Sequence, residues 1–311
     1  MATMLAARVN AFGGPEVLTL EQVPIPEPKE GEVLLAIRAA SINPVDYKTR
    51  AGKYPGVTAA DLPRTLGRDG SGVVAKLGPG VSDVKEGDAI YAMIGRNRGT
   101  WAEYVILKAD ERVAKPKTLD HAHAGATPLA ALTAWQALFD HGGVQAGQRV
   151  LIHAASGGVG HFATQFAKLK GAHVIATASG DGIAFARAHG ADEVIDYKTQ
   201  RFDDVVKDVD VVFDTMAGEV QDRSWAVLKK GGILVTILGQ PNEEKAKAHG
   251  VRAARFLCAI KADQLAEIGR LIDDGKVRVA VQQSFALADM LKAQELAERG
   301  PIRGKIVIEN R

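Results

Sequence analysis

A glycine-rich turn in the middle of the chain is the segment whose composition points most directly to chemistry. It reads ASGGVG over residues 155–160, which matches the spacing G-x-G-x-x-G with Ala155 in the first glycine position. Glycine at 157 lets the backbone approach an anion closely, and Gly160 lets a helix pack against the preceding strand. The N-terminus of that helix adds free N–H groups. The pattern predicts a pyrophosphate cradle for a dinucleotide, formed by Ser156, Gly157, Gly158, Val159 and Gly160.

This turn requires a strand before it and a helix after it, and the flanking residues predict both. Residues 150–152, Val-Leu-Ile, form a short apolar run that is typical of a buried strand. After the turn, apolar residues recur at helical spacing on one face: Val159, Phe162, Ala163, Phe166 and Ala167. Apolar runs then alternate with helical segments as far as residue 238. This alternation predicts a parallel sheet covered by helices on both faces.

The remainder of the chain has a different composition and pattern. Residues 1 to about 120 are punctuated by glycine and proline, with short runs of strand character at 33–37, 72–75, 89–93 and 102–107. They predict a small β-barrel or sandwich-like domain. The tail predicts helices at 264–272 and 287–299, and extended segments at 277–284 and 304–308. Pattern alone does not assign these last strands to either domain.

Composition limits the classes of partner. The 311 residues are enough for two domains, and a formal net charge of +2 is too small to indicate nucleic acid or a membrane surface as partner. No apolar run approaches the roughly 18 residues of a membrane span, and the first residues lack a signal-peptide layout. We therefore expect a cytoplasmic protein. Cys258 is the single cysteine, and the close pair His121 and His123 would place its rings on different helix faces, so neither suggests a metal site.

Four segments in order resemble the medium-chain dehydrogenase/reductase superfamily, and more narrowly its zinc-free branch of quinone oxidoreductases and alkenal or enone reductases. Residues 41–48 (SINPVDYK) resemble the active-site segment, and residues 66–74 (LGRDGSGVV) are similar to the glycine-rich barrel signature. Residues 129–135 (LAALTAW) resemble the helix that faces the nicotinamide, and residues 154–160 carry the fingerprint turn. The likeness covers nearly the whole chain.

The resemblance implies an α/β fold in which a GroES-like β-barrel catalytic domain is joined to a Rossmann domain with a doubly wound parallel sheet. Residues 1–120 would form the catalytic domain, residues 121–269 the Rossmann NAD(P)-binding domain, and residues 270–311 would return to complete the first. The resemblance also implies a homodimer through the edge of the Rossmann sheet.

Zinc-bearing members of the superfamily hold a metal with cysteine, histidine and an acid or second cysteine. Here the first ligand position reads INPVD over residues 42–46, the second reads Gly67-Arg68-Asp69, and the third falls near residues 127–129. Residues 93–105 contain no cysteine lobe. These positions do not supply three converging zinc ligands, so we expect no metal. Alcohol dehydrogenase chemistry, which needs a Lewis acid for the alkoxide, is disfavoured for the same reason.

The strand after the turn lacks the acid that NAD-preferring sites place about 20 residues after the fingerprint. It ends at Thr177 with hydroxyl groups and no carboxylate, which leaves room for a 2′-phosphate. In similar quinone oxidoreductases a serine, a following lysine and a later tyrosine hold that phosphate. Ser179 and Tyr197 match the serine and the tyrosine, although Ser179 is equally suited to cap the next helix.

The lysine of that set is not matched, because Asp181 or Gly182 stands near its place. Arg187 and Lys198 are the candidates to compensate for the missing charge. We expect NADPH as the cofactor, with NADH as the alternative.

A nicotinamide without a metal suits hydride transfer to an activated double bond, in a quinone or an α,β-unsaturated carbonyl. The charge then collects on the substrate oxygen, which needs a hydrogen-bond donor and a proton. The candidates are Asn43, Tyr47 and Lys48, and Tyr47 and Lys48 are favoured. The alternatives are a solvated lysine and a tyrosine in the pocket wall, with orientation of the substrate supplying much of the rate.

Further cofactor contacts come from the helix at 129–135 and from loops at the carboxyl ends of the later strands, where ligands bind in open α/β sheets. Cys258 is expected to be a buried small hydrophobe rather than a nucleophile. Arg96, Arg98 and Trp101 are candidates for the substrate entrance, with a solvated loop as the alternative for the arginines. The expected contacts beyond the turn are Thr133, Thr177, Ser179, Tyr197, Ala217, Leu238, Gly239, Phe256 and Cys258.

Two other functions stay open. The first is a dinucleotide-binding sensor or interaction protein of the same fold with weak turnover, because fold does not determine function. The second is an NAD-linked alcohol dehydrogenase. Retention of the whole segment from Asn43 to Lys48 favours an enzyme acting on a small quinone or enone.

Overall fold

The computed structural model describes residues 2–310, which form two compact units. Within these residues, the first unit comprises 2–130, 260–275 and 279–310, and the second comprises 131–259 and 276–278. Each unit has its own sheet system and its own buried core.

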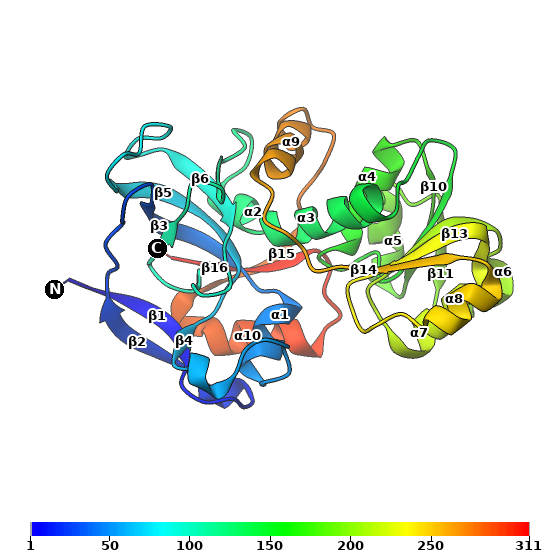
Figure 1. Ribbon diagram of the computed structural model, residues 1–311, viewed down its shortest axis with the longest axis horizontal. Helices are drawn as coiled ribbons and strands as arrows, with labels where there is room; N and C mark the ends of the chain where they lie inside the picture. The colour runs from blue at the N-terminus through cyan, green and yellow to red at the C-terminus, as the bar shows by residue number, and fades with distance from the viewer. Residues whose placement is uncertain (1, 311) are drawn as a thin grey trace. The chain divides into compact units, whose positions relative to one another are not determined.

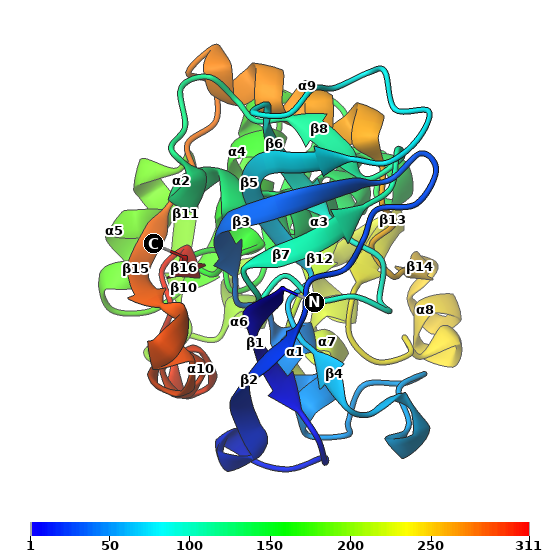
Figure 2. The ribbon, with the colours of Figure 1, turned by 90° about the vertical axis from the view of Figure 1, so that its left-hand side faces the viewer.

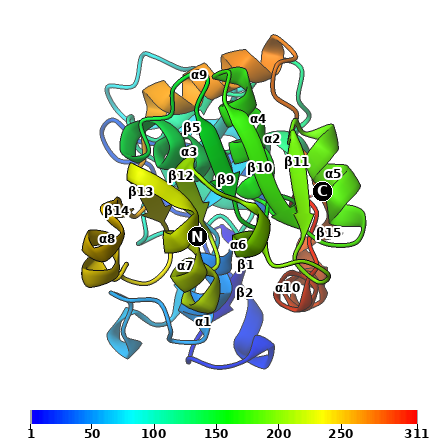
Figure 3. The same cartoon turned by 90° about the vertical axis from the view of Figure 1, so that its right-hand side faces the viewer.

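The second unit is built on a sheet whose strands run in the order β11-β10-β9-β12-β13-β14, with every neighbouring pair parallel (Figure 3). The prediction of a parallel α/β sheet is confirmed. The crossover from β9 through α4 to β10 brings the fingerprint turn to the carboxyl edge of this sheet. The strands are β9 (Arg149–Ile152), β10 (His173–Ala178), β11 (Glu193–Asp196), β12 (Val209–Asp214), β13 (Leu228–Thr236) and β14 (Arg252–Arg255).

Helices pack on this sheet along its whole width. Helix α4 (Gly160–Leu169) contacts β9 and β10, α5 (Asp181–Ala188) contacts β10 and β11, and α8 (Glu243–His249) contacts β14. Of the predicted apolar face, Phe162, Ala163, Phe166 and Ala167 are buried and Val159 is half-buried. The polar side chains between them, His161, Thr164 and Gln165, are buried as well, so the first turns of α4 are covered on all sides. Shorter elements complete the unit: α3 (Pro128–Trp135), which begins in the first unit, a π-helical turn η3 (Gln136–His141), α6 (Phe202–Val205), α7 (Gly218–Ser224) and η4 (Trp225–Val227).

Two helices of this unit begin directly after a residue with a positive φ. Helix α5 begins at Asp181, and α7 begins at Gly218. The residue before each start, Gly180 and Ala217, has a positive φ of 52° and 60°. A left-handed residue reverses the chain direction after a strand, so the helix can begin at once.

The first unit is β-rich, as predicted. A small sheet has the order β2-β1-β4, and a larger one has the order β15-β16-β3-β5-β6-β8, with β7 paired to β3 (Figure 2). Their apolar residues, including Leu35, Ile90 and Trp101, form one core. The strands of this unit are β1 (Thr3–Val9), β2 (Leu18–Pro24), β3 (Val33–Ser41), β4 (Arg64–Thr65), β5 (Asp69–Leu77), β6 (Ala89–Met93), β7 (Tyr104–Leu107), β8 (Arg112–Ala114), β15 (Val281–Ala286) and β16 (Lys305–Glu309).

The C-terminal strand completes the first unit. Strand β16 lies between β15 and β3, and Val307 is paired with Ser41 in an antiparallel register (Figure 1). The end of the chain therefore belongs to the first unit. The helical elements here are η1 (Pro15–Val17), α1 (Pro44–Arg50), η2 (Ala59–Asp61), α2 (His121–Gly125), α9 (Ala262–Asp273), η5 (Leu287–Asp289) and α10 (Met290–Arg299).

The extended segment expected at 277–284 becomes a strand only from Val281. Arg278 belongs to the second unit, where its N–H donates to Oε1 of Gln165 (2.8 Å) and its carbonyl accepts from Nε2 of the same side chain (2.9 Å). These two bonds use the backbone of Arg278, so sheet pairing starts after it.

Candidate functional site

The fingerprint turn is packed as the glycine spacing predicts. A Cβ atom on Gly160 would lie 2.3 Å from the carbonyl oxygen of Ala154 and 2.7 Å from Cα of Ala155. Only glycine fits there, because real Cβ atoms do not approach backbone so closely. A Cβ on Gly157 would lie 3.3 Å from the same oxygen, which is also tight. The turn between β9 and α4 therefore keeps its backbone close to the strand end. The N–H groups of Gly157 and His161 already donate to the carbonyls of Ala154 (3.0 Å) and Gly157 (3.1 Å), so an anion here would be bound by the other N–H groups at the start of this ten-residue helix.

Thr177, at the end of β10, holds this turn in place. The N–H of Ala154 donates to Oγ1 of Thr177 (3.2 Å), and the N–H of Ala155 donates to the Thr177 carbonyl (3.1 Å). Ala154 has a φ of 51°, a left-handed conformation that costs an alanine about 1 kcal/mol or more. Thr177 is buried, so it is placed to support the turn rather than to present its hydroxyl to a ligand.

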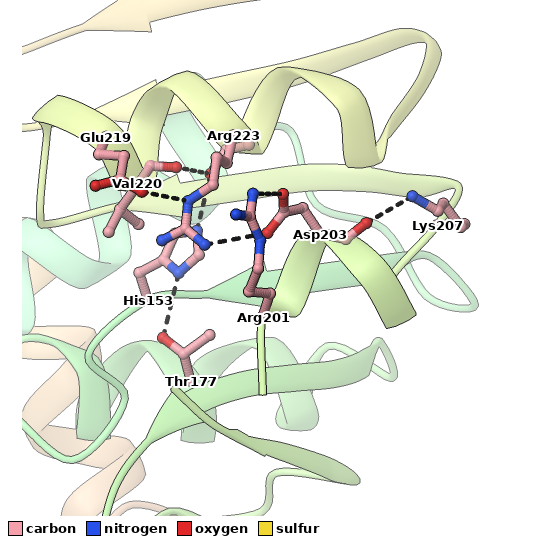
Figure 4. A network of polar contacts seen from close by, with 9 residues as sticks. His153, Thr177, Arg201, Asp203, Lys207, Glu219, Val220 and Arg223 are labelled. Atoms are coloured by element: carbon pink, nitrogen blue, oxygen red, sulfur yellow. Dashed lines mark hydrogen bonds and ion pairs between the residues drawn. The ribbon is translucent and has the colours of Figure 1, made fainter. Parts of the chain in front are cut away.

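His153 extends this support across the sheet (Figure 4). Its Nδ1 lies 3.2 Å from Oγ1 of Thr177, and its Nε2 lies 2.9 Å from Oγ of Ser224. The Ser224 hydroxyl donates to the carbonyl of Val220 (2.7 Å), so it must accept from Nε2–H of His153. Nδ1 is then the acceptor, and the Thr177 hydroxyl donates to it. A single chain of hydrogen bonds thus runs from the Ala154 N–H through Thr177, His153 and Ser224 to α7.

This chain requires a neutral imidazole. Burial lowers the pKa of His153 from 6.5 to about 4, the charge of Asp214 opposes that change, and the charge of Arg223 adds to it. Arg223, on α7, lies beside the imidazole ring of His153. It forms ion pairs with Asp203 (3.1 Å) and Glu219 (3.5 Å) (Figure 4).

Two residues that were expected at the adenosine end of the cofactor, Ser179 and Tyr197, lie together. The hydroxyl of Ser179 donates to the phenol oxygen of Tyr197 at 2.8 Å, and the Tyr197 side chain is exposed. The alternative interpretation of Ser179 as a helix cap is wrong, because Gly180 occupies that position and no side chain caps α5. Asp181 is the first residue of α5 and stands where a lysine was expected, while Arg187 lies in the last turn of the same helix.

Two loops at the carboxyl edge are tied together by the buried carboxylate of Asp214. It accepts from the N–H of Ala217 (3.0 Å) and from Oγ1 of Thr236 (3.0 Å). The same Thr236 hydroxyl oxygen accepts from the N–H of Leu238 (3.0 Å). A Cβ on Gly239 would lie 3.9 Å from Cβ of Ala217. The predicted loop residues Ala217, Leu238 and Gly239 are thus brought to one place.

A third group comes from the helix after Ala131 and the segment after β14. Nε2 of Gln136 donates to the carbonyl of Ala259 (2.9 Å), and Oε1 of Gln136 accepts from the N–H of Ala259 (2.9 Å). This clamp joins the helix of the buried Thr133 to the segment that carries Phe256 and Cys258. Phe256 is buried and stacks on the His141 ring with centroids 4.5 Å apart. Cys258 is half-buried, which corrects the expectation of a buried cysteine.

In the first unit, Asp69 joins the three segments that carry zinc ligands in metal-bearing members of the superfamily. Its Oδ1 accepts from the Ser41 hydroxyl (2.7 Å) and from Nδ2 of Asn43 (2.9 Å), and its Oδ2 accepts from the N–H of Leu129 (2.9 Å). Arg68 donates Nε and Nη2 to the carbonyl of Ile94 (3.2 and 3.0 Å). Among residues 2–310, no group of three histidine, cysteine, aspartate or glutamate side chains is placed to hold a metal ion.

A buried amine completes this cluster. Nζ of Lys305, on β16, donates to the carbonyl of Ile42 (2.8 Å) and to Oδ1 of Asn43 (2.5 Å). Burial lowers the pKa of Lys305, and the charges of Asp69 and Asp46 oppose that shift. Burial also raises the pKa of Asp46 to about 7, although its carboxylate accepts from the Asn43 N–H at 2.8 Å.

Asn43 is consequently fixed inside the protein. Its Nδ2 donates to the hydroxyl oxygen of Ser41 and to the carboxylate of Asp69, and its Oδ1 accepts from Lys305. It caps α1 and positions the next two candidates, Tyr47 and Lys48, which are half-buried on that helix. Burial raises the pKa of Tyr47, with the charges of Glu298 and Asp46 adding to it, and burial lowers the pKa of Lys48.

Trp101 is not at an entrance. Its ring is fully buried and its Nε1 donates to the Ser41 carbonyl (3.1 Å), so it belongs to the core beneath the cluster.

Sequence reasoning did not select Lys305, His153 or Asp214 as site residues. Each is a polar residue attached to an apolar run: Lys305 precedes Ile-Val-Ile, His153 follows Val-Leu-Ile, and Asp214 follows Val-Val-Phe. A polar side chain at the end of a buried strand needs a partner, and this signal could have drawn attention to them.

Comparison with known proteins now identifies the family. A model described as "Alcohol dehydrogenase GroES-like domain" matches residues 29–117, and one described as "Zinc-binding dehydrogenase" matches residues 189–308. The chain belongs to the medium-chain dehydrogenase/reductase superfamily. Its relatives place it in the quinone oxidoreductase and alkenal reductase branch, so the first unit is the GroES-like domain and the second is the Rossmann domain.

The similar proteins span nearly all of the chain. The mitochondrial NAD(P)H oxidoreductase RTN4IP1 of Homo sapiens is 34% identical, covering 96% of this chain and 87% of its own. The chloroplastic NADPH-dependent alkenal/one oxidoreductase of Arabidopsis thaliana is 35% identical over 96% and 77%. The solved structure of a quinone oxidoreductase from Coxiella burnetii is 38% identical, covers 100% of both chains and has a TM-score of 0.94. The chain is therefore an oxidoreductase of this branch.

No helix within residues 2–310 is both long and apolar enough to cross a lipid bilayer.

Proposed function

We propose that this chain is an NADPH-dependent reductase that transfers hydride to a quinone or an α,β-unsaturated carbonyl without a metal. The observation that carries the proposal is the pairing of Ser179 with Tyr197 beside a turn that only glycine at position 160 permits. The names of the relatives, which include an alkenal/one reductase and a quinone oxidoreductase, support the substrate class.

The residues of the second unit fit a dinucleotide phosphate. The N-terminus of α4 and the backbone of residues 156–160 would hold the pyrophosphate. The two hydroxyls of Ser179 and Tyr197 offer hydrogen bonds to a 2′-phosphate, and no acid ends β10 to favour a bare ribose. Asp181 opposes a dianion here, so NADH is the alternative cofactor. Thr133, Ala217, Leu238, Gly239, Phe256 and Cys258 would line the rest of the cofactor.

When bound, the dihydronicotinamide would supply a hydride, which is a proton with two electrons, to the β-carbon of the acceptor. The double bond of the acceptor would be reduced, and its carbonyl oxygen would gain the negative charge of an enolate. Tyr47 or Lys48 then donates a hydrogen bond to that oxygen and supplies the second proton. Desolvation keeps the Tyr47 phenol protonated and makes the Lys48 ammonium a stronger acid. Asn43 acts as a positioning residue for both.

The bonds of Asp69 support the metal-free part of the proposal. Its two oxygens already accept three hydrogen bonds, and Arg68 presents a cation where metal-bearing members have histidine. Stoichiometric zinc in the purified protein would contradict this part and would favour an alcohol dehydrogenase. Location in the cytoplasm and a homodimer stay predictions, since relatives include mitochondrial and chloroplastic proteins.

The proposal is tested by following NADPH oxidation with a panel of quinones, enals and enones. We expect saturable turnover with at least one member, and a lower KM for NADPH than for NADH. Saturable NADPH binding without oxidation by any acceptor would overturn the reductase and leave a dinucleotide-binding sensor of the same fold.

A further inference from the structure

Four arginines of the first unit line one small recess. Arg64, Arg68, Arg96 and Arg98 surround a cavity of about 20 Å³, together with Tyr54 and a single carboxyl group, that of Asp46. A space of this size holds a water molecule or one small polar group, since about 10–15 Å³ suffices for a water. We call this cavity the arginine recess.

Three of the four arginine side chains, those of Arg64, Arg68 and Arg96, are held in place by neutral groups. Arg68 bonds the Ile94 carbonyl through two nitrogens, and Arg64 donates to the carbonyl of Arg96. The Arg96 guanidinium lies 5.4 Å from the centre of the Tyr54 ring, in a cation–π contact. Carbonyls and an aromatic face orient guanidinium groups but do not neutralise them.

Their charge is not balanced within the protein. Among residues 2–310, Arg64, Arg68 and Arg96 have no carboxylate within ion-pair distance, whereas Arg98 is paired with Glu111. Burial lowers the pKa of Arg64, an effect that the positive charge of Arg68 increases and Asp61 opposes. With a pKa near 7, the Asp46 carboxyl carries only part of a charge at neutral pH.

Two donors in the lining also lack an acceptor. The Nε atoms of Arg64 and Arg98 are both buried, and neither has a hydrogen-bond partner in the protein. A buried donor left unpaired costs about 1–3 kcal/mol, and more when it is charged. A cluster of fixed, unbalanced guanidinium groups with unpaired N–H groups is the arrangement that binds a planar carboxylate through forked hydrogen bonds.

We propose that the arginine recess binds a carboxylate carried by the substrate, so that the preferred acceptor is an enone or quinone with an acidic arm. This inference rests on the proposed reductase function. The recess lies beside the helix of the candidate donors, because Asp46 and Thr49 in its lining belong to α1 together with Tyr47 and Lys48. Its small volume favours one carboxylate over a larger phosphoryl group.

A matched pair of substrates tests the proposal on the full chain. The enone 6-oxooct-7-enoate and its methyl ester have the same vinyl ketone, which four methylene groups separate from the carboxyl group, so the two differ in charge but not in the reactivity of the double bond. We expect kcat/KM for the acid to exceed that for the ester by about tenfold or more, since one charge-assisted hydrogen bond is worth about ten- to hundredfold. Equal values for acid and ester would overturn the proposal.

Variants then locate the effect. Arg96 is exposed, so Arg96→Gln should fold, and it should lower the acid-to-ester ratio by about tenfold through KM for the acid. Arg96→Lys should restore part of the ratio, because it keeps the charge but not the fork. Arg299→Gln, at an exposed position at the end of α10, is the control and should keep the ratio of the parent chain. A ratio that falls equally in Arg96→Gln and Arg299→Gln would contradict a site in the recess.

A binding measurement separates this inference from the function on which it rests. The saturated acid 6-oxooctanoate and its methyl ester can be titrated calorimetrically without turnover. Tighter binding of the acid that is lost in Arg96→Gln supports the recess even if no enone is reduced, in which case only the reductase proposal fails. Turnover of the ester with no binding of the acid would overturn the recess and leave the reductase standing. Equal competition by acetate and by the acid would mark a site for any small anion and would also contradict the proposal.

Discussion

Burial shifts the pKa values of Tyr47 and Lys48 in opposite directions. It raises the pKa of the phenol and lowers the pKa of the ammonium. A phenol with a raised pKa is a persistent hydrogen-bond donor, whereas an ammonium with a lowered pKa transfers its proton more readily. The two residues are adjacent on a helix that Asn43 caps and that Lys305 and Asp69 anchor through Asn43. This difference allows their roles to be distinguished by kinetics.

The first prediction concerns these donors. Tyr47→Phe and Lys48→Met remove one donor each, and we expect at least one of them to lower kcat by about 10²-fold while the Kd for NADPH is unchanged. Lys53→Met, at an exposed site just after α1, is the control and should keep the parent kcat. Parent-like kcat in both Tyr47→Phe and Lys48→Met would show that neither side chain takes part in proton transfer.

The pH profile assigns the donor. If Lys48 supplies the proton, kcat falls as pH rises and the ammonium is lost, and this limb lies below the usual lysine value of 10.5 because burial lowers the pKa. The limb should be absent in Lys48→Met and present in Tyr47→Phe. Steady-state kcat measured across the alkaline range, with cofactor and acceptor saturating, decides the point. An alkaline limb unchanged in Lys48→Met would exclude lysine as the source of the proton.

A second pair of residues decides the cofactor. Ser179→Ala and Tyr197→Phe each delete a hydroxyl of the proposed 2′-phosphate site, so each should raise KM for NADPH by about tenfold and leave KM for NADH nearly unchanged. Ser82→Ala, at an exposed position of the first unit, serves as the control. Equal changes in both KM values would place the hydroxyls away from the phosphate.

At the scale of elements, a single polar side chain can hold several elements together through its hydrogen bonds. His153 joins the end of β9 to β10 through Thr177 and to α7 through Ser224. Asp214 does the same for the loops after β12 and β13. The fingerprint turn therefore depends on a hydrogen-bond chain that works only while His153 is neutral.

This dependence predicts acid sensitivity. The unfolded chain binds a proton at His153 below about pH 6.5, but the folded chain does so only below about 4. Between these values the unfolded state holds more protons, so the free energy of unfolding should fall as pH drops, by on the order of 3 kcal/mol in total. Urea unfolding at pH 7 and at pH 4.5 measures this difference in the free energy of unfolding. The difference should shrink in His153→Gln and persist in the exposed control His249→Gln, and an unchanged difference in His153→Gln would contradict this account.

Strand β16 has a comparable dependence on Lys305. Lys305→Met leaves the Ile42 carbonyl and Oδ1 of Asn43 without their donor, so we expect a loss of about 2–4 kcal/mol in the free energy of unfolding and a lower kcat. Lys292→Met, exposed on α10, should lose less than about 0.5 kcal/mol. Denaturant unfolding with both variants in parallel provides the test. A loss in Lys305→Met no larger than that in Lys292→Met would show that the buried amine contributes little.

At the scale of the whole molecule, hydrophobic period and glycine spacing were sufficient to predict a parallel sheet, a β-rich domain and the fingerprint turn. They succeed because each reflects a local constraint, such as the absence of space for a Cβ on Gly160. The return of β16 to β3 came from the family resemblance, because sheet pairing between residues so distant in the chain leaves no local pattern.

The supporting residues of the site were harder to predict for the same reason. Asp69 meets Asn43 and Leu129, and Lys305 meets Ile42, only after the chain has folded. Cys258 and Trp101 were misplaced because exposure depends on neighbours that composition does not reveal. Ser179 and Tyr197 were paired from family likeness and lie within hydrogen-bond distance.

The position to which hydride is delivered tests the central claim most directly. NADPH carrying deuterium at both hydrogen positions of C4 of the dihydronicotinamide, incubated with the protein and an enone, should yield a saturated ketone with one deuterium on the β-carbon per cofactor oxidised. Mass spectrometry and proton NMR of the product read this position without ambiguity. Deuterium on the carbonyl carbon of an allylic alcohol would contradict the account, because it would indicate carbonyl reduction of the alcohol dehydrogenase kind.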